Sequence, residues 1–186
     1  MTDKELERGF NLTLRNAKEL IEEANGLAIF ERYSRAYSLY QLAIEEIGKC
    51  IIIYVAILDY YMGITVNEKY LRDKGFFNHK EKTKASLKSE LLVISLFEKS
   101  TGKKTNLSQD VIEDSENIDQ INEKKNQSLY VGLKEDNFLS PNFMINKNMV
   151  DEIAYKACVR WKGAEPLMLP LKKMKFLAEE IKANYI

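Results

Sequence analysis

The periodic pattern of apolar and polar positions is clearest over residues 35–61. Apolar side chains recur there at the spacing of a helix with one face on a core. Over residues 50–58 the only polar side-chain group is the Tyr54 hydroxyl, and a helix that is apolar on all sides must be covered on nearly all of them. We therefore predict that residues 35–61 form the central helix of the fold, with Ser34 as its N-cap.

Helical periodicity also precedes this segment. Thr2 and Glu5 have the spacing of a capping box, and the apolar positions that follow predict a first helix from about Asp3 to Phe30. The link to the central helix is short, so the two helices are expected to pack as an antiparallel hairpin. This hairpin is the predicted frame of the molecule.

Later segments give shorter or weaker patterns. We predict a short helix over residues 67–74, a third main helix that follows GFFNHKEK and reaches about Ser100, and a weaker helix over 110–129 interrupted at NEKKNQ. Residues 103–115 are polar and charge-mixed and are expected to form an exposed, mobile excursion. Residues 130–147, which include Pro141, are expected to form a loop.

Residues 148–186 predict C-terminal helices. Asn148 is expected to cap the first of them, and a terminal helix from about Pro170 is expected to dock on the core through its apolar stripe. The residues of that stripe are Leu171, Met174, Leu177, Ala178 and Ile181. The predicted fold is an all-α bundle of four to six helices, built on the antiparallel hairpin, in a single domain spanning residues 1–186.

Composition narrows the classes of function. The 28 basic residues balance 28 acidic ones, so no overall positive field predicts nucleic-acid binding, and only a local basic patch remains open. The first residues lack the apolar core of a signal peptide, and the apolar run after Lys49 is too short to cross a bilayer. We expect a cytoplasmic protein without membrane contact. Cys50 and Cys158 are expected to be buried free thiols, with a disulfide between them as the alternative.

His79 is the only histidine, and this excludes several kinds of site. A ferritin-like di-iron centre and a zinc hydrolase helix each need two histidines. The sequence also has no G-x-S-x-G nucleophile elbow and no Walker-type phosphate loop. We therefore expect no metal and no cofactor.

Three charged residues, Glu45, Glu46 and Lys49, lie in the middle of the central helix. The spacing of Glu45 and Lys49 places them on one face, where they are expected to interact. Since an unpaired buried charge is costly, polar side chains from elsewhere in the chain are expected to compensate these three. The candidates are His79, Lys82, Lys125, Asn126 and Tyr130.

Two interpretations of these residues remain open. A histidine beside lysines suits metal-independent cleavage of RNA, in which a base removes the 2′-hydroxyl proton and cations stabilise the charge on phosphorus. The alternative is a buried structural network of ion pairs and hydrogen bonds. Nearby, Lys80, Lys84 and Lys88 share one helical face, which is either solvated or a phosphate-contacting patch.

Three stretches, RAYSLYQLAIEEIGK, FFNHKEK and SLYVGLKEDNFLSP, resemble in this order the AbiV family of bacterial abortive-infection proteins, a branch of the HEPN superfamily. The resemblance rests on Ala43, Glu45, Glu46, Gly48 and Lys49, on Phe77, His79 and Lys82, and on residues 129–131. It implies an HEPN-like helical bundle, frequent homodimerisation, and a part in phage defence through arrest of growth or translation.

Many HEPN proteins are ribonucleases with an Arg-x(4-6)-His motif, and here Lys125 and Tyr130 stand nearest to those two positions. Lys lacks the planar fork with which Arg holds a phosphate, and Tyr, which titrates at about pH 10, is a poor base at neutral pH. Two hypotheses follow. The first is a homodimer that arrests growth by binding a phage protein or the translation machinery. The second is an HEPN-type ribonuclease, with RNA as its partner, in which His79 is the base.

Overall fold

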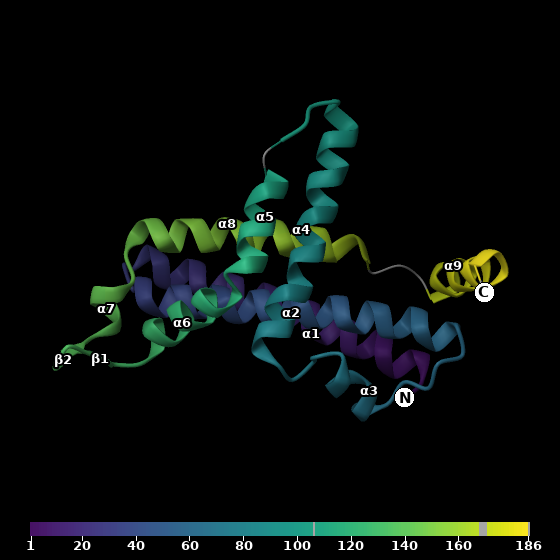
Figure 1. Cartoon of the computed structure of the whole chain (residues 1–186), viewed down its shortest axis with the longest axis horizontal. Helices are drawn as coiled ribbons and strands as arrows, with labels where there is room; N and C mark the ends of the chain where they lie inside the picture. The colour runs from purple at the N-terminus through teal and green to yellow at the C-terminus, as the bar shows by residue number, and fades with distance from the viewer. Residues whose placement is uncertain (106, 168–170, 186) are drawn as a thin grey trace.

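The computed structural model describes residues 1–105, 107–167 and 171–185, and these residues are predominantly helical (Figure 1). Helices α1 (Asp3–Ile29) and α2 (Tyr33–Tyr61) lie side by side as an antiparallel hairpin. The predicted all-α fold built on a long hairpin is therefore confirmed.

The two helices of the hairpin begin in different ways. The Thr2 hydroxyl accepts a hydrogen bond from the Glu5 amide, and the Glu5 carboxylate accepts one from the Thr2 amide, so the predicted capping box is confirmed. The predicted cap of α2 is wrong, because Arg32 precedes the helix without a side-chain cap and Ser34 lies in its first turn. The Ser34 hydroxyl instead donates to the side chain of Asn142 at 2.7 Å.

The central position predicted for α2 is confirmed by the helices that cover it. It packs against α1, α4 (His79–Thr101), α6 (Ile118–Leu129) and α8 (Lys147–Ala164). The short helix α3 (Glu68–Asp73) follows α2, as predicted for residues 67–74. Each of these contacts removes another side of α2 from water, which is why residues 50–58, with the Tyr54 hydroxyl as their only polar side-chain group, are stable there.

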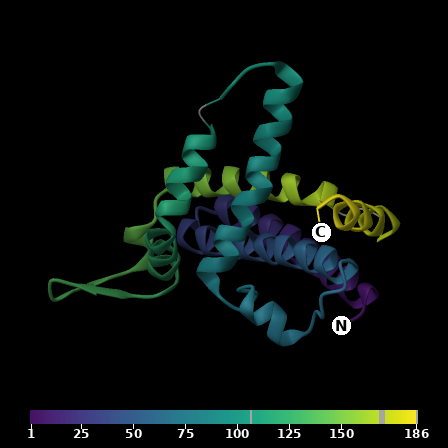
Figure 2. The same cartoon turned by 45° about the vertical axis from the view of Figure 1, so that its right-hand side comes forward.

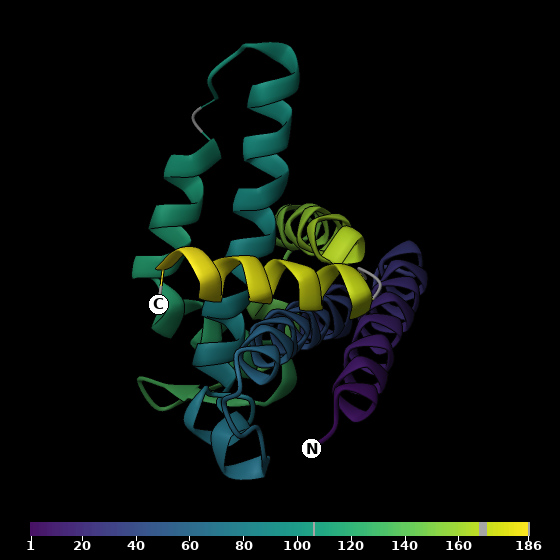
Figure 3. The same cartoon turned by 90° about the vertical axis from the view of Figure 1, so that its right-hand side faces the viewer.

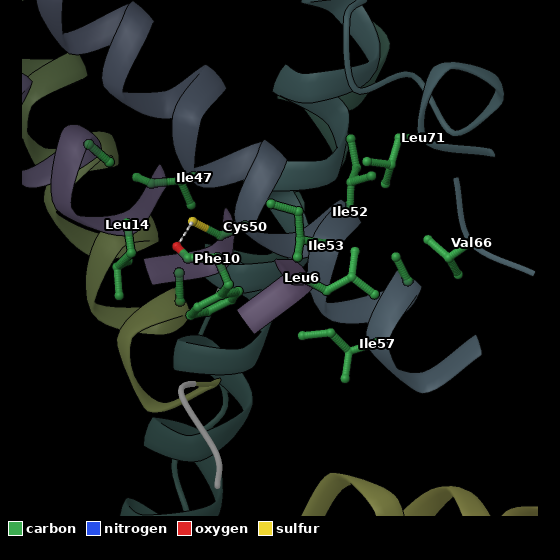
Figure 4. Close-up of a cluster of buried hydrophobic side chains, with 13 residues drawn as sticks. Leu6, Phe10, Leu14, Ile47, Cys50, Ile52, Ile53, Ile57, Val66 and Leu71 are labelled. Carbon is green, nitrogen blue, oxygen red and sulfur yellow. Dashed lines mark hydrogen bonds between the residues drawn. The ribbon is translucent and has the colours of Figure 1, made fainter. Parts of the chain in front are cut away.

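The main core lies between α1 and the apolar segment of α2, and Figure 4 shows its buried side chains. Leu6, Phe10 and Ile53 are among the residues that interlock there. Cys50 lies in the same core, where its thiol donates to the Phe10 carbonyl oxygen, and burial raises the pKa of this thiol to about 12. The second cysteine, Cys158, is exposed, so its predicted burial is wrong.

Helix α4 crosses α2 and α8 at two glycines, where the helices approach closely. A Cβ atom at Gly48 of α2 would lie 1.8 Å from the carbonyl oxygen of Lys82, and one at Gly163 of α8 would lie 2.0 Å from that of Ser89. Neither crossing has room for a side chain larger than hydrogen. This close approach fixes α4 against the hairpin and places its first turns beside the middle of α2.

The outer half of α4 and α5 (Leu107–Glu116) form an arm that projects from the bundle (Figures 1 and 3). At the root of the arm, Leu87 and Ile94 pack with Val111 and Ile118. The predicted excursion over residues 103–115 is therefore wrong where α5 lies, because this segment is helical and buries Val111. The helix that we predicted over residues 110–129 is interrupted at Asn117, between α5 and α6, and not at NEKKNQ.

Residues 130–147 are not the loop that we predicted. They contain the antiparallel strands β1 (Gly132–Lys134) and β2 (Asn137–Leu139), which project from the bundle (Figure 2), and the short helix α7 (Pro141–Met144). Pro141 begins α7 because a proline at the first helical position lacks only an amide that needs no partner there. The next helix, α8, is capped by Asn146 and not by Asn148.

The predicted terminal helix is present as α9 (Leu171–Tyr185), which follows the short 3-10 helix Glu165–Leu167 and contacts α2. Of its stripe, Ala178 is buried and Ile181 is half-buried, but Leu177 is exposed. The side chains of Leu171 and Met174 lie outside the described part of the structure. None of the helices searched among the described residues is long and apolar enough to cross a membrane.

Candidate functional site

The carboxylate of Glu45, in the middle of α2, is the centre of a buried cluster of charges. Its Oε1 accepts a hydrogen bond from Lys125 Nζ of α6 at 2.7 Å. Its Oε2 lies 3.0 Å from Lys82 Nζ and 2.6 Å from His79 Nδ1, both on α4. We call these four residues the Glu45 cluster. Three helices that are distant in sequence therefore meet at one carboxylate.

The contacts within the cluster favour the ionised form of Glu45. Burial alone would raise the pKa of Glu45, but the hydrogen bonds from Lys125, His79 and Lys82 outweigh burial and lower the pKa below its ordinary value of 4.5. The side chains of Glu45, Lys82 and Lys125 are less than a tenth exposed. A carboxylate that is already bound by three donors inside the protein is typical of a structural network.

His79 is the one member of the cluster that reaches the surface, because its side chain is 58% exposed. An ionised carboxylate can only accept hydrogen bonds, so Nδ1 is the protonated ring nitrogen in the contact with Glu45. A carboxylate that orients a histidine in this way is also a feature of general-base sites. The histidine is thus the residue of this cluster through which chemistry at the surface could take place.

Glu46 and Lys49 form a separate pair. Lys49 Nζ donates to Glu46 Oε1 at 2.5 Å, and the same ammonium lies 5.4 Å from the centre of the Phe76 ring. The expected interaction between Glu45 and Lys49 is therefore wrong, since Lys49 turns to the neighbouring carboxylate and Glu45 faces α4 and α6. Both side chains of the pair are partly exposed.

The remaining candidates do not join the Glu45 cluster. Asn126 is exposed, and Tyr130, which is 65% exposed, lies beyond the end of α6. The segment from Lys125 to Tyr130 thus turns its first side chain inwards and its last one outwards. Lys80, which shares one face of α4 with Lys84 and Lys88, pairs with Asp119 at 2.6 Å. Part of the positive charge of this face is therefore already neutralised.

A second buried cluster, which the sequence did not reveal, is centred on Arg160 of α8. Its Nε donates to Glu90 of α4 at 2.7 Å, and its Nη2 donates to Asp114 of α5 at 2.6 Å. Asp114 also accepts from Lys156 at 2.8 Å. Burial lowers the pKa of Lys156, but hydrogen bonds to Asp114 and Glu152 outweigh it and raise the pKa. We call Arg160, Glu90, Asp114 and Lys156 the Arg160 cluster.

One sequence signal could have identified the Arg160 cluster. Arg160 lies three residues after Ala157 and four before Ala164, at positions that continue the buried face of α8. A charged residue on an apolar helical stripe needs buried partners. The two carboxylates come from α4 and α5, and the sequence does not indicate that these helices meet α8 there.

The described residues contain no group of three or more His, Cys, Asp and Glu side chains that could hold a metal ion. The site is therefore defined by its ion pairs and by the helices that these join. A long helical hairpin crossed by a further helix, with a buried carboxylate at the crossing, makes the described part of the chain an all-α bundle.

Comparison with known families extends this classification. The family model HEPN_AbiV, described as AbiV, matches residues 5–160. The chain therefore belongs to the AbiV family of HEPN proteins, as the resemblance of its three motifs implied. Neither the comparison with curated proteins nor the comparison with solved structures gives a match.

The residues of the first motif have different structural roles. Glu45 is the centre of the buried cluster, and Lys49 pairs with Glu46 nearer the surface. Gly48 allows the α4 backbone to approach, and this approach brings Lys82 to Glu45. The motif A-x-E-E-x-G-K thus describes a helix crossing and the buried ion pairs beside it.

Proposed function

We propose that this protein is a phage-defence protein of the abortive-infection type, which arrests growth or translation in infected cells. It acts as a homodimer that binds a phage protein or a component of the translation machinery. Membership of the AbiV family over residues 5–160 supports the defence role. The observation that carries the binding mechanism is the group of exposed apolar side chains on the two parts that project from the bundle.

The first projection is the β hairpin, and we assign the homodimer contact to it. Leu133 and Phe138 are directly opposite each other in the two strands and are 64% and 80% exposed. Glu135 and Asp136, which connect the strands, both have positive φ. A two-stranded hairpin with its apolar side chains in water is marginally stable, and a second copy packed on the same face would cover them.

The apolar segment of α2, residues 50–58, is buried or half-buried within this chain and therefore does not present an exposed apolar face for a dimer contact. Ile51, Ile52, Ile53 and Ile57 are all buried within this chain. The contacts of α1, α4 and α8 with α2 account for this coverage. An unpartnered apolar surface therefore has to be sought outside α2, and the β hairpin supplies one.

The second projection is the arm, and we assign the contact with the phage or translation component to its outer part. Leu96 and Phe97 of α4 and Ile112 of α5 are each about half exposed. Exposed apolar side chains with charged neighbours are typical of protein-binding surfaces. The arm extends away from the β hairpin (Figures 1 and 3), so a homodimer formed through the β hairpin leaves the arm accessible.

Sedimentation velocity and a phage-plaque assay test these assignments together. We expect the wild-type protein to be a dimer at micromolar concentration, L133S/F138S to be a monomer that does not protect cells, and L96S/F97S to be a dimer that does not protect. The control K134S/N137S changes flanking residues of the same strands and is expected to dimerise and protect. A monomeric wild type at this concentration would contradict the homodimer.

A metal-independent ribonuclease is the second candidate, and one observation favours it. His79 Nδ1 contacts the Glu45 carboxylate at 2.6 Å while much of the ring is exposed, which is the arrangement of an oriented base. The nearby cations Lys82 and Lys125 are buried against Glu45 and are not presented to a phosphate at the surface. For this reason the binding mechanism is the better-supported one.

A further inference from the structure

A cavity of about 400 Å³ lies among α2, α4, α5, α6 and α8. No member of the Glu45 cluster lines it, so it is separate from that cluster. Its volume is in the range of cavities that hold small ligands. We call it the Tyr37 cavity, after the tyrosine of α2 that lines it.

Two polar groups on α2 face this cavity without partners. The side chain of Tyr37 is 5% exposed, and its hydroxyl makes no hydrogen bond within the described ranges. Gln41 is 2% exposed, and its amide nitrogen donates to Thr83 at 3.2 Å while its carbonyl oxygen has no donor in the described part of the chain. Neither oxygen is fully enclosed by the described residues, so each is open to a donor that enters the cavity.

The charges around the Tyr37 cavity favour a cation over an anion. Five carboxylates and three basic side chains line it. Ion pairs within the cavity wall join three of these carboxylates, Glu90, Asp114 and Glu152, to two of the basic groups, Lys156 and Arg160, which leaves one negative charge in excess there. Lys124 is the third basic group of the lining. Asp110 and Glu113 of α5, in contrast, form no ion pair among the described residues. Burial and the carboxylates of Glu152 and Asp114 also raise the pKa of Tyr37, so its hydroxyl stays protonated at neutral pH.

The rest of the lining suits an alkyl chain. Ile44, Ile121, Met149 and Ile153 supply apolar surface from α2, α6 and α8. An elongated ligand with polar ends and a methylene stem would satisfy both the apolar walls and the polar groups. Single ammonium ions or metal ions would leave the apolar walls without contacts.

From these features we propose that the Tyr37 cavity binds a linear aliphatic polyamine. One ammonium group donates to the Tyr37 and Gln41 oxygens, the methylene chain packs between the apolar walls, and a second ammonium group pairs with Asp110 and Glu113. Because the two ends of the ligand contact α2 and α5, binding ties the arm to the central helix. This proposal does not depend on the protein's role in phage defence.

Isothermal titration calorimetry with spermidine at physiological salt tests the proposal. We expect saturable binding to the wild type, weakened about fivefold by Y37F, which removes one hydroxyl that has no hydrogen-bond partner among the described residues. D110N/E113Q is expected to weaken it about tenfold, since it removes both unpaired carboxylates. The control E179Q/E180Q makes the same charge change at two exposed positions of α9 and is expected to bind like the wild type.

Hydrogen exchange provides a second measurement, because spermidine should slow the exchange of α5 amides in the wild type but less in Y37F. The proposal would be overturned by the absence of saturable binding, or by equal weakening in the control, which would show a non-specific charge effect. Stronger binding of AMP than of spermidine would also overturn it. So would binding of a lysine-rich peptide without binding of spermidine, which would assign the cavity to a protein partner.

Discussion

The two buried clusters of this protein have opposite arrangements of charge. In the Glu45 cluster a single carboxylate accepts from two lysines and a histidine. In the Arg160 cluster a single guanidinium donates to two carboxylates and to the Ser86 hydroxyl. Helix α4 contributes to both, and it crosses α2 and α8 at the two glycines that lie near them.

The difference that matters is which helices each cluster joins. The Glu45 cluster joins α2, α4 and α6 in the middle of the bundle. The Arg160 cluster joins α8 to α4 and α5 at the root of the arm. Local stability follows local contacts, so damage to the first should destabilise the whole fold, whereas damage to the second should first release the arm.

The largest expected effect is that of E45Q. Gln has the shape of Glu but leaves Lys82 and Lys125 buried without a counter-charge, so the free energy of unfolding should fall by about 3–5 kcal/mol. Urea unfolding followed by circular dichroism measures this loss. A loss below about 1 kcal/mol would show that the buried charges are hydrated or compensated in another way.

R160M should cost about 3 kcal/mol, at the lower end of the range for breaking a buried ion pair. Met keeps much of the side-chain volume, and Asp114 keeps its contact with Lys156, but Glu90 loses its partner. Hydrogen exchange is expected to accelerate in α5 before it does so in α2. If E45Q gave the same local pattern, the contrast between the two clusters would be wrong.

The pH dependence of stability separates Glu45 from other carboxylates. Its pKa is lowered in the folded protein, so its contribution is present above the ordinary value of 4.5 and is lost as the pH falls through the lowered value. The stability difference between wild type and E45Q should therefore shrink below pH 4.5, by at most about 1.4 kcal/mol per pH unit. Unfolding curves at several pH values measure it, and a difference that stays constant through the acid range would contradict this assignment.

The smallest expected effect is that of E46Q. Its pair with Lys49 is partly exposed, and pairs of this kind contribute about 1 kcal/mol or less. E46Q is thus a control for E45Q that changes the adjacent residue in the same way. A loss for E46Q as large as that for E45Q would show that the two glutamates do not differ as their burial indicates.

The sequence was informative where the chain is regular. The long hairpin follows from periodicity, and Glu45 was identifiable because a charge inside an apolar helix requires partners. The partner of Lys49 was predicted wrongly because spacing along α2 does not show that Glu45 faces α4 and α6. Arg160 was missed because its carboxylate partners come from two other helices.

The sequence was least informative after α6. Tyr130 has extended backbone angles, so the helical spacing from Lys125 no longer determines where its side chain points. The β hairpin was missed because Glu135 and Asp136 occupy a turn with positive φ in place of the usual Asn-Gly or Asp-Gly pair. Three-residue strands also give too short an alternation to identify.

The most direct test concerns His79, because it is the exposed member of the Glu45 cluster and the base of the alternative ribonuclease. Wild type and H79Q, whose amide can still donate to Glu45, are incubated with transfer, ribosomal and messenger RNA and compared for protection of cells against phage. If the cluster is structural and the protein acts by binding, both proteins leave the RNA intact and both protect. The account would be contradicted if the wild type cleaved RNA and if an equally stable H79Q neither cleaved RNA nor protected cells. That result would establish catalysis.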